Sequence, residues 1–366
     1  MIISDITNFL EKIAPLPYQE SYDNCGLLTG NASWNCTGVL VCLDATEAVI
    51  NEAIHKKCNL VISHHPLVFK GLKKLSGNSF VEQAIITAIK HDIAVYAIHT
   101  NLDNVLNGVN GKIADTLSLI NRSVLLPREG TLKKLFTFVP VDKAEMVRNA
   151  IFSSGGGHIS NYSECSFSVE GLGTFKPGLN TNPFIGKKGD RHQEKEIKIE
   201  VIFPAFLERT IIQGMMAAHP YEEVAYDIMS LENQHMSVGA GLVGELLHPM
   251  EERDFLSLLK KCFNLRIIRH SALRDRPVKT VALCGGAGGF LAGNALARKV
   301  DFFITADLKY HEFFEANGAM VVADIGHFES EQYTVQLIHE LLMVNFSSFA
   351  LLKTEVDTNP VNYFLS

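Results

Sequence analysis

The chain has 366 residues, 47% of them hydrophobic and 20% charged, and is therefore long enough for two or three domains with ordinary apolar cores. Its formal net charge of −7 disfavours nucleic-acid binding, because contact with a phosphate backbone requires a basic face. Scattered cysteines without a CxxC pair, an N-terminus without a basic leader and the lack of an apolar run of about 18 residues predict a cytoplasmic protein without a membrane span.

The N-terminal part of the sequence alternates between helices and short apolar strands. We expect helices at 4–13, 46–57, 81–91 and about 110–119, and strands at 38–43, 60–63 and 93–98. Strands rich in Val, Ile and Leu that alternate with helices indicate βαβ units and a parallel sheet. In such sheets, ligands bind beyond the carboxyl ends of the strands.

A different pattern begins near Leu125 and ends at the glycine-rich junction 239–244. It contains expected strands at 135–139, 197–203 and 223–228, expected helices at 143–153 and 206–217, and a loop-like stretch at 171–194. After the junction we expect helices at 251–263, 290–298, 309–316 and 328–344, and strands at 280–284, 302–304 and 320–325. The predicted fold class is α/β: a parallel-rich βαβ sheet domain of residues 1–125 and 245–366, with an inserted ferredoxin-like α+β domain of residues 126–244.

Two adjacent histidines, His64 and His65, directly follow the expected strand 60–63. Neighbouring side chains on extended backbone point to opposite sides, which disfavours one shared metal ion but suits two adjacent ions. In isolation, such a pair is more often a hydrogen-bonded core residue beside a solvated one. The rest of the chain has to distinguish the two interpretations.

Two other expected strand ends carry complementary side chains. His99 and Asp103 lie at or just past the end of the next strand. His327 and Glu331 follow the last strand and, four residues apart, share one face of a helix. Imidazoles mixed with carboxylates suit zinc, manganese, iron or nickel better than calcium or magnesium. Five or six such ligands are more than one tetrahedral ion needs, whereas two ions about 3.5–4 Å apart with a bridging carboxylate would use them all.

The ordered motifs SHHP, HTNLD and GHFESE, with a domain inserted between the last two, resemble the GTP cyclohydrolase 1 type 2 family. Further similar segments are YDNCGL at 22–27, the strand end Leu43-Asp44, and HPYEE at 219–223, which resembles a motif of the longer members. The resemblance covers nearly the whole chain. One departure is Thr305-Ala306-Asp307, where members typically read TGD, and we expect it not to touch the metal ligands.

The resemblance implies two divalent metal ions per chain, which would be zinc, manganese or iron. Five side chains would bind them: His64 and Asp103 on one ion, His65 and His327 on the other, and Glu331 bridging both. His99 would lie beside the pair as a catalytic residue. Individually, each residue also has a plain structural explanation, such as a turn cap for Asp103 or a preference of Glu331 for a helix N-terminus.

Paired metal ions lower the pKa of a shared water and clamp anionic substrates, so hydrolysis is the expected reaction class. The resemblance implies a nucleotide substrate, with opening of the imidazole ring of GTP and loss of formate, and a ring-shaped homohexamer. The alternative is a metal-binding regulatory or scaffold protein without turnover, in which the insert senses a ligand or builds the oligomer. The loop Gly285–Gly289 fits either phosphate binding by backbone N–H groups or a tight turn between strand and helix.

Overall fold

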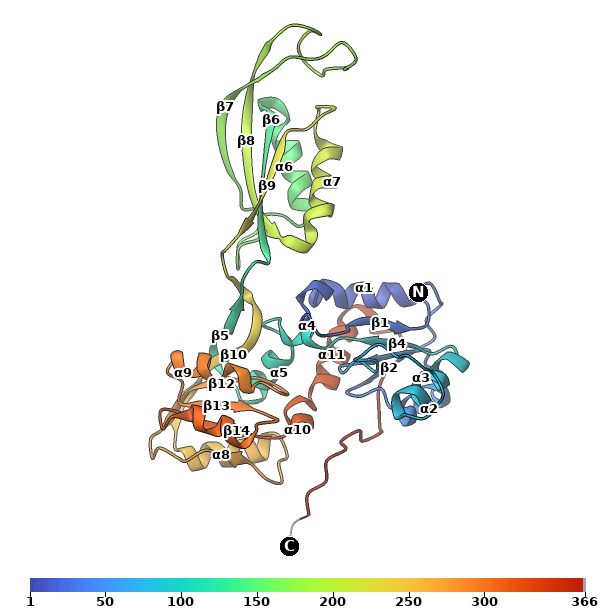
Figure 1. The fold of residues 1–366 in the computed structure, drawn as a ribbon, viewed down its shortest axis with the longest axis vertical. Coiled ribbons are helices and arrows are strands. Elements are labelled where there is room, and N and C mark those ends of the chain that lie inside the picture. The colour runs from blue at the N-terminus through green and yellow to red at the C-terminus, as the bar shows by residue number, and fades with distance from the viewer. Residues whose placement is uncertain (365–366) are drawn as a thin grey trace. The chain divides into compact units, whose positions relative to one another are not determined.

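Two compact units make up the computed structural model, which describes residues 1–364. The first unit combines Met1–Leu126 with the chain from Ser237 onward, and the second is Pro127–Met236. The fold is mixed α/β, and the described residues form several β-sheets (Figure 1). None of the helices in this part of the chain is long and apolar enough to cross a membrane.

One sheet of the first unit has five strands in the order β1-β4-β3-β2-β15. The strands are Gly26–Thr29 (β1), Val39–Cys42 (β2), Leu60–Ser63 (β3), Ala94–Ala97 (β4) and Leu351–Lys353 (β15). Strands β15, β2, β3 and β4 run parallel, and β1 pairs antiparallel with β4. The helices that precede or connect these strands are Ile3–Ile13 (α1), Glu47–His55 (α2) and Phe80–Lys90 (α3), and Thr100–Asp103 (α4) and Val109–Thr116 (α5) follow β4.

The other sheet of this unit has six strands in the order β11-β14-β13-β12-β10-β5. They are Ile120–Arg128 (β5), His235–Met250 (β10), Arg269–His270 (β11), Val278–Leu283 (β12), Phe302–Thr305 (β13) and Val321–Asp324 (β14). Strands β12, β13 and β14 run parallel, whereas β10 and β11 pair antiparallel with β12 and β14. The site-bearing strands β3, β4 and β14 therefore lie in two sheets, and not in the single parallel-rich sheet that the sequence predicts.

The helices around the second sheet are Glu252–Cys262 (α8), Ala292–Ala297 (α9), His327–Glu331 (α10) and Thr334–Phe346 (α11), with a 3-10 helix at Tyr310–Ala316. The single long helix expected at 328–344 is thus two helices. The first of them, α10, is only five residues long and begins and ends with predicted site residues.

A hydrophobic core shared by the two sheets fixes the ends of their strands relative to one another. In β13, Phe302 and Ile304 enter this shared core, whereas Phe303 lies in a separate cluster with α9 on the opposite face. The rings of Phe255 on α8 and Phe302 pack edge to face with centroids 4.8 Å apart. Because such strands are buried on both faces, they read as continuous apolar runs in the sequence.

The second unit has a four-stranded antiparallel sheet in the order β7-β8-β6-β9. Its strands are Leu132–Pro140 (β6), Phe167–Phe175 (β7), His192–Pro204 (β8) and Tyr226–Leu231 (β9). The helices Ala144–Ser153 (α6) and Glu208–Ala218 (α7) cover one face of this sheet (Figure 1). The sequence did not predict β7, because this edge strand is almost wholly exposed and buries no alternating apolar side chains.

Candidate metal centre

The six predicted site residues come together in the first unit, at strand ends of both sheets. His64 and His65 follow β3. After β4, His99 directly precedes α4 and Asp103 is its last residue. After β14, His327 begins α10 and Glu331 ends it. Two groups have potential ligand atoms within 4.8 Å of one another: His64, His65 and His99, and His65, His327 and Glu331. Asp103 lies next to the first group, with its Oδ1 3.7 Å from His64 Nε2.

The rings of His64 and His65 do not diverge to opposite sides, contrary to the expectation from extended backbone. Their centroids lie 5.0 Å apart with the planes tilted by 45°. Strand β3 ends at Ser63, so the strict alternation of side chains ends before the two histidines. Both rings therefore face the same cluster of carboxylates.

His64 is fully buried, and one of its ring nitrogens has no hydrogen-bond partner in the described part of the chain. Its Nδ1 lies 2.9 Å from the carbonyl oxygen of Ile98. A carbonyl only accepts, so Nδ1 donates to it, and Nε2 is the ring nitrogen that faces the carboxylates. The nearest carboxylate oxygens, Asp103 Oδ1 and Glu331 Oε1, are 3.7 and 3.8 Å from Nε2. Asp103 Oδ1 is likewise buried and unpaired among the described residues.

The other three histidines have Nδ1 held by a carboxylate. The Nδ1 contacts are 2.7 Å from His65 to Asp44, 2.9 Å from His99 to Asp23, and 2.8 Å from His327 to Asp307. Such contacts fix the ring orientation and leave Nε2 as the nitrogen that can bind a metal, an arrangement that is usual around metal-binding histidines. In each of the four rings, the acceptor at Nδ1 thus holds a proton on that nitrogen and leaves Nε2 facing the cluster.

These three aspartates were not predicted as site residues, although each lies in a segment that resembles the family. The expectation that Asp307 does not touch the predicted ligands is wrong. Asp307 follows β13 with a left-handed backbone (φ 56°), and its Oδ2 lies 2.8 Å from His327 Nδ1. Acidic residues just past the ends of neighbouring parallel strands are the signal that would have found Asp44 and Asp307.

Glu331 lies between the histidines with its two oxygens directed to different sides. Oε1 is 3.8 Å from His64 Nε2, whereas Oε2 is 3.0 Å from His65 Nε2 and 3.2 Å from His327 Nε2. Its side chain is only 3% exposed. A β-carbon at Gly286, which has a φ of +60°, would collide with Oε1. The glycine-rich loop therefore makes room for Glu331.

The same loop does not offer a free phosphate cradle. Three of its backbone N–H groups already donate to side chains: Gly285 to Asn110 Oδ1 at 3.0 Å, Gly286 to Ser330 Oγ at 3.0 Å, and Gly288 to Thr305 Oγ1 at 2.8 Å. The tight-turn interpretation of Gly285–Gly289 fits these contacts and the phosphate interpretation does not.

A family model described as Duf34/NIF3 (NGG1p interacting factor 3) matches residues 1–360. The chain belongs to the Duf34/NIF3 family. A relative from Bacillus subtilis (strain 168), named GTP cyclohydrolase 1 type 2 homolog, is 38% identical over 366 residues, which cover 98% of this chain and 97% of the relative. The family resemblance found in the sequence is thereby confirmed.

Solved structures of similar proteins agree with the fold. The crystal structure of a Bacillus cereus protein related to NIF3 matches with a TM-score of 0.87 and 34% identity, covering 100% of this chain and 99% of that one. A Staphylococcus aureus protein matches with a TM-score of 0.78 and 29% identity over the same shares of the two chains. The mixed α/β fold with several sheets is therefore shared with Duf34/NIF3 proteins.

In this Duf34/NIF3 chain, neighbouring carboxylates raise the pKa of two of the clustered histidines. Burial alone would lower the pKa of His65, but its hydrogen bonds with Asp44 and Glu331 raise the pKa to about 10. Burial alone would also lower the pKa of His327, but its hydrogen bonds with Glu331 and Asp307 raise the pKa to about 9. Burial raises the pKa of Asp103 to about 7, and the charge of Glu331 adds to this rise. Protons and cations would therefore compete for the same side chains.

Two pockets reach the cluster in this Duf34/NIF3 chain. One, of about 410 Å³, is lined by His99, Asp103 and Glu331 together with the aromatic side chains of Tyr22, Phe69 and Phe290. The other, of about 450 Å³, is lined by Asp44, Asp307, His327, Arg269 and Tyr363. Both volumes lie in the range of roughly 300–1,000 Å³ that is usual for small-molecule sites. The first pocket combines the predicted catalytic His99 with flat apolar walls.

Proposed function

We propose that this chain is a hydrolase that depends on two divalent metal ions. The proposed ligands are His64 and Asp103 for one ion, His65 and His327 for the other, and Glu331 between them. The observation that carries the proposal is the pair formed by His64 Nε2 and Asp103 Oδ1, which are buried, unpaired among the described residues and 3.7 Å apart. Unsatisfied buried polar atoms are costly, and one cation would satisfy both. Zinc, manganese or iron fits the mixture of imidazole and carboxylate.

Divalent ions bound here would lower the pKa of a water and neutralise charge on an anionic substrate. The protein itself supplies orientation: Asp44 and Asp307 hold the rings of His65 and His327 so that Nε2 of each faces Glu331. His99 lines the 410 Å³ pocket and is held at Nδ1 by Asp23, which leaves Nε2 to exchange a proton with a substrate. We therefore assign His99 as the catalytic acid or base.

The proposed substrate is a nucleotide, with GTP as the first candidate. The name of the Bacillus subtilis relative suggests it. The side chains of Tyr22, Phe69 and Phe290, which line the pocket beside His99, offer apolar faces on which a purine ring can stack. Divalent ions held by Asp103 and Glu331, which line the same pocket, would suit the negative charge of the phosphates.

We further propose that residues 126–244 form an inserted ferredoxin-like domain and that the protein is a homohexamer. The element order β6-α6-β7-β8-α7-β9 with the sheet order β7-β8-β6-β9 supports the first point. The second rests on the family resemblance alone, and light scattering of the purified protein tests it.

The test combines elemental analysis with a nucleotide turnover assay on one preparation. We expect metal-dependent hydrolysis of GTP with release of formate, which His65→Ala abolishes and His91→Ala, a substitution of an exposed histidine outside the cluster, leaves unchanged. If the protein retains its metal but hydrolyses neither GTP nor any other nucleotide, the enzyme proposal fails and the regulatory or scaffold alternative is supported.

A further inference from the structure

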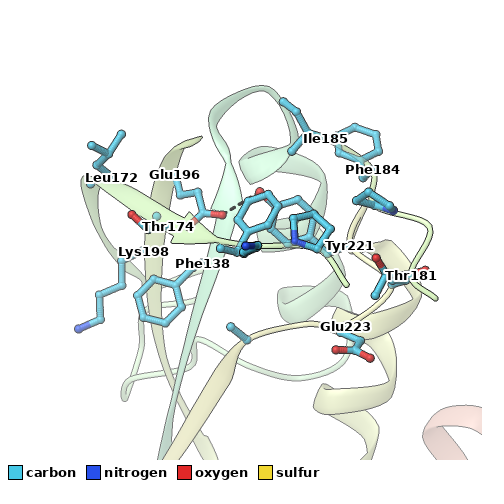
Figure 2. Close-up of a pocket in the computed structure, with 18 of the residues that line it drawn as sticks. Phe138, Leu172, Thr174, Thr181, Phe184, Ile185, Glu196, Lys198, Tyr221 and Glu223 are labelled. Carbon is cyan, nitrogen blue, oxygen red and sulfur yellow. Dashed lines mark hydrogen bonds between the residues drawn. The ribbon is translucent and has the colours of Figure 1, made fainter. Parts of the chain in front are cut away.

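A separate pocket of about 660 Å³ lies in the second unit, on the face of the sheet that α6 and α7 leave open (Figure 2). Leu135 and Val139 of β6 pack in the core under the helices, so the intervening Phe138 points to the open face and lines the pocket. The segment that connects β7 to β8 lines the opposite wall with Pro177, Phe184 and other residues. The metal centre uses none of these residues.

One buried charge lies in this pocket. Glu196 on β8 is 8% exposed, and the other charged side chains of the lining are exposed or half-buried. The hydroxyl of Tyr221 donates to Glu196 Oε1 at 2.8 Å (Figure 2). The second oxygen, Oε2, makes no hydrogen bond with the described residues and is open to the pocket that Glu196 lines. A β-carbon at Gly173 would collide with Oε2, so the glycine on the edge strand makes room for this carboxylate.

The HPYEE segment at 219–223, which the metal centre does not use, builds one wall of the pocket. His219 anchors it: one ring nitrogen lies 3.0 Å from the carbonyl oxygen of Phe138, and the other accepts the backbone N–H of Tyr221 at 3.1 Å. Glu222 accepts the backbone N–H of Asn182 at 2.8 and 3.1 Å and so ties the opposite wall to this segment. These contacts hold the pocket in shape without a ligand, which favours binding.

Aromatic rings surround the end of the pocket where Tyr221 lies. The ring centroid of Tyr221 is 5.9 Å from that of Phe175 and 6.3 Å from that of Phe184. Aromatic faces attract cations, and a neighbouring carboxylate adds a charge-assisted hydrogen bond. The neighbouring Lys198 does not neutralise Glu196, because its ammonium group is 2.8 Å from Glu200 and lies over the ring of Phe136.

We propose that this pocket binds a small organic ammonium ion. Its apolar body contacts the rings of Phe175, Phe184 and Tyr221, and an N–H group donates to Oε2 of Glu196. This pairing gives Oε2 a charged donor beside the one that Tyr221 gives Oε1. It also matches the charge of the lining, which has four carboxylates (Glu170, Glu196, Glu222 and Glu223) and two lysines (Lys176 and Lys198). The excess of carboxylates disfavours binding of an anion. A neutral ligand cannot form a charge-assisted hydrogen bond with Glu196 and should bind more weakly.

Calorimetric titration of the full-length protein with 2-phenylethylammonium tests the proposal, with 2-phenylethanol and phenylacetate as probes of the same apolar body. We expect saturable binding of the ammonium ion, weaker binding of the alcohol, and no binding of the carboxylate. Glu196→Gln weakens ammonium binding about tenfold or more, as expected for a charge-assisted hydrogen bond. Glu194→Gln is the matched control, because Glu194 lies two residues away on the same strand and face but outside the pocket.

A second variant fills the pocket and leaves the residue at position 196 unchanged. A β-carbon at Gly171, which lines the pocket, would meet no atom within 4 Å. We therefore expect Gly171→Leu to occupy pocket space and abolish binding while unfolding temperature and metal content stay unchanged. Ser168→Leu, on the same strand outside the pocket, is its control and leaves binding intact. Equal binding of the ammonium ion and the alcohol, unchanged binding in both pocket variants, or no saturable ammonium binding would each overturn the proposal.

Discussion

His64 Nε2 and Asp103 Oδ1 lie 3.7 Å apart, both buried and both without a hydrogen-bond partner among the described residues. The distance is too long for a hydrogen bond. It suits two ligands of one ion, because atoms about 2.0–2.2 Å from a common metal are separated by roughly 3–4 Å. His64 follows β3, and Asp103 ends the short helix after its parallel neighbour β4. The pairing of β3 with β4 thus brings together the two potential ligand atoms that have no hydrogen-bond partner among the described residues.

Asp307→Asn tests whether the acceptor at Nδ1 matters. The amide no longer stabilises a proton on Nδ1 as a carboxylate does, so His327 loses its fixed orientation and basicity. We expect metal affinity to fall about 10- to 100-fold, measured by competition with a chelator. Asp254→Asn, which changes an exposed aspartate on α8, should leave affinity unchanged. Equal affinities of Asp307→Asn and wild type would show that this contact does not tune the site.

Gly286→Ala tests the close approach of the glycine-rich loop to Glu331. The new β-carbon collides with Glu331 Oε1 and also occupies a backbone conformation with φ +60° that favours glycine. We expect loss of metal from both positions, because Glu331 faces histidines on each side, and elemental analysis measures it. Gly293→Ala in α9 is the control, since a side chain there meets no atom within 4 Å. Full metal content in Gly286→Ala would exclude a bridging role for Glu331.

Metal uptake should release protons and strengthen as the pH rises. In the metal-free protein, the pKa of about 10 for His65 and about 9 for His327 keeps both imidazoles protonated near neutral pH. Only neutral imidazole binds a metal, so apparent affinity falls as the pH is lowered and levels off only above these pKa values. Calorimetry at about pH 7.5 in two buffers of different ionisation enthalpy measures the released protons. Identical heats in the two buffers would contradict this prediction.

The sequence predicted the strands that are buried on both faces and the side chains that follow them. Leu60–Ser63 and Val321–Asp324 read as continuous apolar runs, and the polar residues at their ends stand out for that reason. The division into two sheets could not be predicted, because it depends on packing between strands far apart in the chain. The edge strand Phe167–Phe175 is almost wholly exposed, and the sequence predicts a loop from residue 171 onward instead.

The aspartates at the histidine Nδ1 atoms show a second limit of the sequence. Asp23, Asp44 and Asp307 follow or precede strands as many aspartates do, and only the folded chain brings each within 2.9 Å of its histidine. The histidines were recognisable as potential ligands because imidazole is the commonest metal ligand. The positions of Asp44 and Asp307 at strand ends mark them as candidates, but only geometry shows which histidine each aspartate contacts.

Metal content per chain in wild type and Asp103→Ala tests the central claim most directly. Asp103 is the better target than His64, because removing a fully buried ring would also damage the core. After reconstitution with zinc, manganese or iron, the dinuclear site predicts about two ions per wild-type chain. Asp103→Ala should retain about one, on His65, His327 and Glu331, with an unchanged unfolding transition. No metal in the reconstituted wild type, or equal content in the two proteins, would contradict the account.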